Sequence, residues 1–124
     1  MNFSEFMQKI RTSVPINTVL ENPGGGTSII LSYSSEGVSY RRGNSTIYVS
    51  LHDLFDGYTK FKGGQMSSNN LKAANPSVFD SQARPAGHSC NCTFLFIVLQ
   101  KLEIITDIHG RGVRGDPYFV ILTE

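Results

Sequence analysis

Apolar residues recur every three or four positions over residues 3–12 and again over residues 51–61. This spacing predicts two amphipathic helices, each with one face turned toward a core. Ser50 precedes the second helix in the position of an N-cap, and the pair Gly63-Gly64 follows its end. A third, shorter helix is predicted over residues 67–74, where polar residues that suit a cap come first.

Between the first two helices the pattern changes to alternation of apolar and polar positions. Residues 27–50 predict three antiparallel strands joined by turns at residues 34–37 and 43–44. The glycine-rich segment 22–27 before them predicts a loop and not a phosphate cradle, because no Lys-Ser/Thr pair and no helix follow it. Alternation means that one face of such a sheet is buried. The positions expected to face the core are Val38, Tyr40, Ile47 and Val49.

The longest unbroken apolar run of the chain, Phe94 to Leu99, lies in a fourth predicted helix. Ser89 occupies the N-cap position of this helix, so that Cys90 and Cys92 both fall in its first turn. Polar residues return only near its end, and a helix that is apolar on nearly all sides is buried. We therefore expect this helix to form the core of the C-terminal half.

Irregular segments flank the fourth helix on both sides. Residues 75–88 before it predict a long loop that the pair Val78-Phe79 anchors in the core. After it, residues 104–108 predict a turn into a strand, residues 109–117 a tight loop rich in glycine and arginine, and residues 118–122 a last strand. The last two strands would form a β-hairpin.

These elements predict an α+β fold. The 124 residues are enough for one core, so we expect residues 1–124 to form a single domain. An N-terminal helix and a three-stranded antiparallel meander would occupy residues 1–49. The remaining helices and the C-terminal β-hairpin would occupy residues 50–124.

Two motifs near the C-terminus carry a resemblance to a known family. The leucine-spaced run Leu99-Gln100-Lys101-Leu102-Glu103-Ile104-Ile105 is followed by Gly110-Arg111-Gly112 and then by Tyr118. Together with the order of helices and strands from residue 50 to 122, these motifs resemble a winged helix-turn-helix module. In that family a similar run ends the third helix, and a wing with a Gly-Arg-Gly-like tip returns to an aromatic strand.

The resemblance implies binding to duplex DNA. It makes Arg111 and Arg114 wing residues that face phosphates or the minor groove, and it brings Asn91 and Thr93 to the DNA at the start of the third helix. The chain departs from the family pattern in two ways, since the segment before the third helix is longer and that helix has almost no polar face for reading a groove. A module of this shape that is used for protein contact is the alternative. In general character, the chain also resembles uncharacterised bacterial proteins carried on mobile gene cassettes (integrons) or by phages.

Charge changes this picture only locally. The formal net charge is +1, which gives no support to a nucleic-acid partner, because such proteins usually carry a basic excess. Residues 41–84 nevertheless hold six Lys and Arg against three acidic residues, enough for one basic face. The candidate phosphate contacts are Arg41, Arg42, Lys60, Lys62, Arg111 and Arg114.

A second function class centres on His88, Cys90 and Cys92. With His109 they offer four ligands of the type that zinc binds, although the Cys-x-Cys spacing is not the usual one for zinc. Alternatively, a cysteine at a helix N-terminus with a histidine base, oriented by Asp107 or Asp116, would suit nucleophilic catalysis. Two cysteines at the start of a helix are more often small core residues. The sequence favours a protein without cofactor, and a binding role over an enzymatic one.

A third class is a protein-interaction module. Surplus apolar surface on the third helix of the winged-helix-like half and on the last strand would suit a homodimer. No apolar run is long enough to span a membrane, so we expect no membrane partner. Two cysteines and no export signal predict a cytoplasmic setting.

Overall fold

The computed structural model describes residues 1–123, so that Glu124, the last residue of the predicted single domain, lies outside the described residues. The α+β class is confirmed, with an N-terminal helix followed by an antiparallel sheet and then by helices and a C-terminal strand pair. In chain order the elements are α1 (Phe3–Ser13), β1 (Val19–Glu21), β2 (Thr27–Tyr33), β3 (Gly37–Arg42), β4 (Ser45–Ser50), α2 (Leu51–Lys60), β5 (Gln65–Ser67), α3 (Ser68–Ala74), α4 (Pro76–Phe79), α5 (Cys90–Lys101) and β6 (Phe119–Ile121).

The larger sheet has the strand order β1-β2-β3-β4, and all its pairs are antiparallel. The predicted meander corresponds to β2, β3 and β4, and its predicted inward positions are all buried. The fourth strand, β1, was not predicted, because its three residues are too few to show alternation. It pairs with the start of β2, and the glycine-rich segment 22–27 forms the turn between them.

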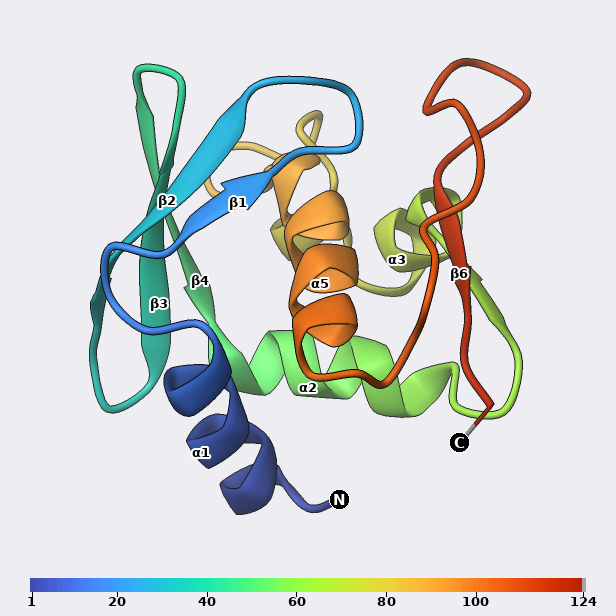
Figure 1. Cartoon of the computed structure of the whole chain (residues 1–124). Coiled ribbons are helices and arrows are strands. Elements are labelled where there is room, and N and C mark those ends of the chain that lie inside the picture. The colour runs from blue at the N-terminus through green and yellow to red at the C-terminus, as the bar shows by residue number, and fades with distance from the viewer. Residues whose placement is uncertain (124) are drawn as a thin grey trace.

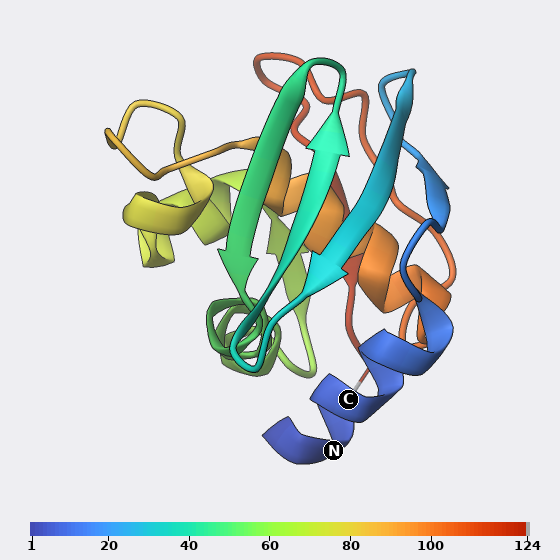
Figure 2. The same ribbon diagram turned by 90° about the vertical axis from the view of Figure 1, so that its left-hand side faces the viewer.

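The apolar helix α5 lies between the four-stranded sheet and the C-terminal part of the chain, with α2 crossing near its end (Figure 1). Seen from the side in Figure 2, the strands β2, β3 and β4 cover it. All nine residues from Asn91 to Leu99 are buried, which confirms the prediction of a core helix. Because the chain itself encloses this helix, its apolar surface is not available to a second copy, and the predicted homodimer contact through it is wrong.

A stacked pair of aromatic rings joins the sheet to α5. The ring centroids of Tyr40 and Phe94 are 4.0 Å apart and the ring planes differ by 2°. The hydroxyl of Tyr40 donates a hydrogen bond to Asn91 Oδ1 at 2.8 Å, and Asn91 Nδ2 donates to the carbonyl of Val78 at 2.9 Å. A buried hydrogen-bonded chain therefore links the sheet, the helix and the segment before the helix.

The C-terminal strand pair is built differently from the predicted hairpin. β6 pairs antiparallel with β5, and on its other side a single bridge joins His109 and Phe119. The predicted strand over residues 104–108 is not formed, because these residues wrap around the end of α5. The amide of Ile104 donates to the carbonyl of Leu99 at 2.9 Å in this turn.

Four connecting segments gather at one end of the molecule. They are the β1–β2 turn, the β3–β4 turn, the segment before α5 and the loop of residues 110–117, all at the top of Figures 1 and 2. The first turn of α5 points toward the same end, whereas α2 and the start of β5 lie at the opposite end. Within residues 1–123, no helix is both long and apolar enough to cross a membrane.

Candidate functional site

A pocket of about 440 Å³ opens at the end of the molecule where the four segments gather. It lies between the end of β3, the first turn of α3, the first turn of α5 and residues 112–118. Its charged lining residues are Arg42, Lys72 and Arg114, and no carboxylate lines it. We call this hollow the basic pocket. It brings together residues from four segments that lie far apart in the sequence.

Arg42 reaches the pocket because it is the last residue of β3. Gly43 follows it with φ +60°, a conformation that favours glycine and turns the chain into β4. The Arg42 guanidinium donates a hydrogen bond to Thr93 Oγ1 at 3.3 Å, and the Thr93 hydroxyl donates to the carbonyl of Cys90 at 3.2 Å. Arg42 is thereby held against the first turn of α5.

Lys72 comes from α3, and the sequence interpretation missed it. The helix begins with a capping box between Ser67 and Asn70, which satisfies its first amides and fixes its start. Lys72 lies three residues after Asn69 and four after Ser68, so the three side chains share one face of the helix and all line the pocket. That spacing was a usable signal in the sequence.

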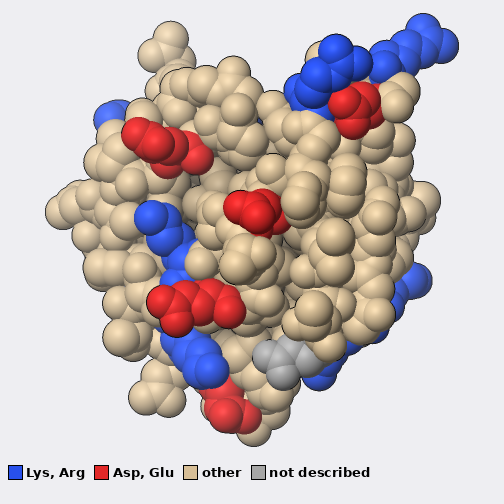
Figure 3. Space-filling view, turned by 45° about the vertical axis from the view of Figure 1, so that its right-hand side comes forward, with Lys and Arg blue, Asp and Glu red and all other residues tan. Residues whose placement is uncertain are grey.

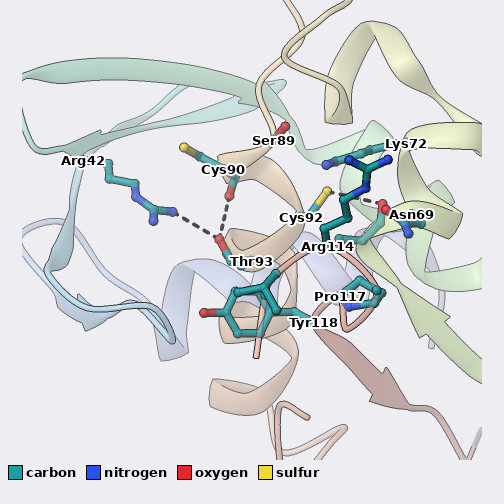
Figure 4. A pocket seen from close by; sticks show the side chains of 14 residues that line it. Arg42, Asn69, Lys72, Ser89, Cys90, Cys92, Thr93, Arg114, Pro117 and Tyr118 are labelled. Atoms are coloured by element: carbon teal, nitrogen blue, oxygen red, sulfur yellow. Dashed lines mark hydrogen bonds between the residues drawn. The ribbon is translucent and has the colours of Figure 1, made fainter. Parts of the chain in front are cut away.

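Arg114 completes the cationic set from the loop of residues 110–117. Figure 4 shows Arg114 and Lys72 on one side of the start of α5, with Asn69 beside them, and Arg42 on the other side. Among residues 1–123, neither Lys72 nor Arg114 forms an ion pair. By contrast, Arg111 donates a hydrogen bond to Asp116 Oδ2 at 2.9 Å, so much of its charge is already balanced within the loop.

Tyr118 closes the floor of the pocket through two close approaches to glycine. A Cβ added at Gly112, where φ is +69°, would lie 2.1 Å from the Tyr118 ring, and one added at Gly24 would lie 2.9 Å from the Tyr118 hydroxyl. At Gly112 the positive φ and the close ring both require glycine, whereas at Gly24 a Cβ would meet only the end of the tyrosine side chain. The loop of residues 110–117 and the β1–β2 turn are therefore held together around Tyr118.

A second hollow of about 460 Å³ adjoins the first at Arg42. Arg41, Arg42 and Gly43 line one side of it, and residues 22–27 line the other. Figure 3 shows basic side chains projecting from one upper corner of the surface with a single acidic group among them, and further acidic and basic groups elsewhere on that face. The β3–β4 turn, which follows Arg41 and Arg42, and the loop that carries Arg111 and Arg114 both lie at the top of Figure 1.

The other two predicted phosphate contacts lie elsewhere. Lys60 ends α2 and Lys62 follows it, at the end of the molecule opposite the basic pocket (Figure 1). The Lys62 ammonium lies 5.8 Å from the centroid of the Tyr58 ring. The structure therefore places Arg42 and Arg114 on one pocket and Arg41 on the adjoining hollow, whereas Arg111 lines neither of them and the two lysines lie at the opposite end.

The expected DNA contacts at the start of α5 are wrong for Asn91. Its side chain is 1% exposed and is engaged with Tyr40 and Val78 in the core. Thr93 is 8% exposed and lines the pocket, where it accepts the hydrogen bond from Arg42. With these residues buried, α5 cannot enter a DNA groove. Ser89 does precede the helix as predicted, but its side chain makes no capping bond and pairs with Ser81 instead.

The cysteines and histidines are not gathered into one centre. Within the described residues, no group of three or more His, Cys, Asp or Glu side chains is placed to hold a metal ion. The His109 ring packs on Phe119 at a centroid distance of 5.1 Å, and neither His109 nor His88 lines the pocket that Cys90 and Cys92 line. Asp116, one of the two suggested orienting carboxylates, is bonded to Arg111.

Cys92 is a core residue. It is 1% exposed, and its Sγ lies 3.6 Å from the carbonyl oxygen of Phe79 and 3.8 Å from that of Ser68. Burial raises the pKa of the Cys92 thiol to about 12, an effect that the nearby Lys72 charge opposes only in part. A neutral, enclosed thiol is a poor nucleophile and a poor metal ligand.

This difference between the cysteines predicts the outcome of a thiol titration. At pH 8 the native protein is expected to react with one equivalent of an aromatic disulfide reagent, at half-buried Cys90, and with a second equivalent only after denaturation. The Cys90→Ser variant should then show no fast-reacting thiol. Rapid reaction of two thiols in the native protein would contradict the burial of Cys92.

A search of protein families, curated proteins and solved structures finds no match to this chain. The function must therefore be argued from the pocket and its surroundings.

Proposed function

We propose that this protein is a small DNA-binding or regulatory protein that contacts backbone phosphates through the end of the molecule that carries the basic pocket. The observation that carries the proposal is that Arg42 and Arg114, from two separate hairpin ends, line one pocket together with Lys72 and without any carboxylate. Arg41 lines the adjoining hollow. Cationic side chains clustered on one face are what a phosphate backbone attracts.

The order of elements after residue 50 supports the resemblance to a winged helix-turn-helix module. α2, β5, α3, α4 and α5 follow one another, and the returning strand β6 pairs with β5 beside a loop that carries Arg111 and Arg114. We propose that contact is made by the loop and the β3–β4 turn, because α5 is enclosed. Phosphate contacts position a protein on DNA without reading its sequence, so we expect binding with little sequence preference.

The setting proposed for this activity is the reducing cytoplasm. Both cysteines are free thiols, and the pair contributes to the core and to the pocket wall and not to a disulfide. Proteins of reducing compartments keep their cysteines in this form.

The test is fluorescence anisotropy with a 20-base-pair duplex whose ends carry hydroxyl groups. Binding is expected at about 50 mM salt and should weaken steeply as salt rises, since each neutralised phosphate releases counterions. In the double variant Arg42→Gln/Arg114→Gln, the slope of log K against log salt should fall by about 1.8, or about 0.9 for each lost phosphate contact.

The matched control is Lys60→Gln/Lys62→Gln, which removes the same charge from the opposite end of the molecule. Its affinity is expected to stay within about twofold of the parent protein, because the charges removed lie at the opposite end of the molecule and salt screens exposed charges from a ligand at the pocket. Absence of duplex binding at low salt would overturn the proposal. Equal losses in the two double variants would move the contact surface away from the basic pocket.

A further inference from the structure

The basic pocket concentrates more positive charge than one internal phosphate needs. Three cationic side chains line it, and Lys72 and Arg114 lie on the same side with no carboxylate between them. Like charges held together in a hollow repel one another, and this repulsion is relieved when an anion of matching charge enters. An internal phosphodiester carries one negative charge, whereas a phosphate monoester carries about 1.5 to 2 at neutral pH.

Neutral donors lie among the three cations. The amide of Asn69 and the hydroxyls of Ser68 and Ser89 line the same pocket. The backbone amides of the α5 first turn contribute less, because Asn91 N–H donates to the His88 carbonyl and Cys92 N–H to the Ser89 carbonyl. Side chains, and not the helix terminus, therefore form the anion-binding surface. A monoester has three free oxygens to accept such bonds.

The walls of the site surround a bound group on several sides. The pocket is lined by the end of β3, by α3, by the first turn of α5 and by residues 112–118, so its cations can approach a terminal phosphate from more than one direction. Its volume of about 440 Å³ lies in the range of small-ligand pockets and suits a phosphate with its sugar. Toward Arg42 it adjoins the hollow lined by Arg41, where the following phosphates would lie.

We propose that the basic pocket binds the terminal phosphate of a nucleic-acid strand, with Arg42, Lys72 and Arg114 as its charged ligands and the adjoining hollow at Arg41 as the path of the strand. This inference rests on the proposed function, since the same end of the molecule contacts the backbone. Tyr118 on the pocket floor offers a ring face to the terminal sugar or base.

The experiment compares labelled 12-nucleotide strands of one sequence that end in a 5′-hydroxyl, a 5′-phosphate or a 3′-phosphate, all bound in 150 mM salt. One of the two phosphorylated strands is expected to bind about tenfold more tightly than the strand that ends in a 5′-hydroxyl. Whether this is the 5′-phosphate or the 3′-phosphate strand gives the polarity of the strand in the pocket. Adenosine monophosphate added as competitor should be at least tenfold weaker than the phosphorylated strand, since it lacks contacts along the path.

Two single variants, Lys72→Gln and Arg114→Gln, test the pocket itself. Each should bring the ratio of affinities for phosphorylated and hydroxyl strands close to one, while binding of the hydroxyl strand falls by threefold or less. The Lys60→Gln/Lys62→Gln control should keep the full ratio. Because Lys72 and Arg114 are partly or fully open to solvent and form no ion pair in the described chain, these changes are not expected to unfold the protein.

The failures of the two proposals are distinguishable. Equal affinity for all three strand ends would overturn the terminal-phosphate site and leave the proposed DNA binding intact. Competition by adenosine monophosphate as strong as that of the phosphorylated strand would overturn the strand path in favour of a free nucleotide. No binding of any strand, together with no duplex binding at low salt, would overturn both.

Discussion

Replacement of Phe94 by alanine is expected to lower the free energy of unfolding by about 3–5 kcal/mol. Phe94 is 2% exposed, and its ring stacks on Tyr40 with centroids 4.0 Å apart. The alanine variant loses both the burial of the ring and the contact between the sheet and α5, and it leaves a cavity that close-packed neighbours fill only in part. Urea denaturation followed by circular dichroism would measure the change.

The control for this prediction is Phe61→Ala. Phe61 is the C-cap residue of α2 and is only partly buried against the core, so its loss is expected to cost less than about 2 kcal/mol. The variant Phe94→Leu should fall between the two, because it keeps most of the apolar volume. If Phe94→Ala were no more destabilising than Phe61→Ala, the stacked contact would not be a main support of the fold.

This contact matters for the site as well as for stability. Tyr40 and Arg42 lie two residues apart on β3, and their partners on α5 are Asn91 with Phe94 and Thr93 respectively. The buried contacts of Tyr40 with Asn91 and Phe94 set the register between the strand and the helix. The hydrogen bond from Arg42 to Thr93 then holds the Arg42 guanidinium on the pocket wall. The packing of the core therefore determines the position of a candidate ligand-binding group.

The helices and the meander could be predicted because their signals are local. The apolar stripe of α2 and its Ser50 cap appear in the structure as expected, with the Ser50 hydroxyl accepting from the Asp53 amide at 3.3 Å. Uniform apolar character predicted the burial of α5. Phe79 was expected as a core anchor and is 1% exposed. In each case the residues that decide the outcome lie within one or two turns of one another.

Features that depend on distant partners could not be predicted in the same way. β1 and β5 have three residues each, and they are strands only because β2 and β6 lie beside them. The basic pocket has the same character, since Arg42, Lys72 and Arg114 meet only after the sheet packs on α5. The sequence singled out the two arginines as charges at hairpin ends. The spacing of Ser68, Asn69 and Lys72 could show only that these three side chains share a helix face, and not that the two arginines lie near that face.

The cysteine motif is a case in which the local pattern suggested a chemical site that the structure does not support. Its spacing drew attention to chemistry, but the two thiols differ in exposure, since Cys92 is buried and Cys90 only half-buried, although both line the pocket. The periodicity of α5 was already the better guide, because it placed the whole first turn beside buried positions. His109 shows the same point, since its backbone bridges to Phe119 and its ring packs there.

The buried thiol and phenol predict a loss of stability at alkaline pH. Burial raises the pKa of Cys92 from its ordinary value of 9.0 to about 12, and burial likewise raises the pKa of Tyr40. In the unfolded chain both groups lose their protons at the ordinary values, so above pH 9 the unfolded state binds fewer protons than the folded one. The free energy of unfolding therefore falls as pH rises, and the contribution of Cys92 is fully present below pH 9 and lost by pH 12.

The size of this effect for Cys92 follows from the two values. Between pH 8 and pH 11 the thiol is expected to remove about 2–3 kcal/mol from the free energy of unfolding, because each unit between its two pKa values corresponds to about 1.4 kcal/mol. The Cys92→Ala variant is expected to be less stable than the parent at pH 8. Between pH 8 and pH 11, however, its free energy of unfolding should fall by about 2–3 kcal/mol less than that of the parent. Urea titrations at the two pH values would measure both losses.

The matched control is Cys90→Ala, which removes the other thiol of the same helical turn. Cys90 raises the pKa of the Cys92 thiol less than burial does, so we expect most of the loss of stability between pH 8 and pH 11 to remain in this variant. Tyr40→Phe provides an independent arm, since it removes the ionisable hydroxyl and keeps the ring stacked on Phe94. An alkaline loss that is unchanged in Cys92→Ala would mean that the thiol is open to solvent, and the wall between the pocket and the core would then have to be placed differently.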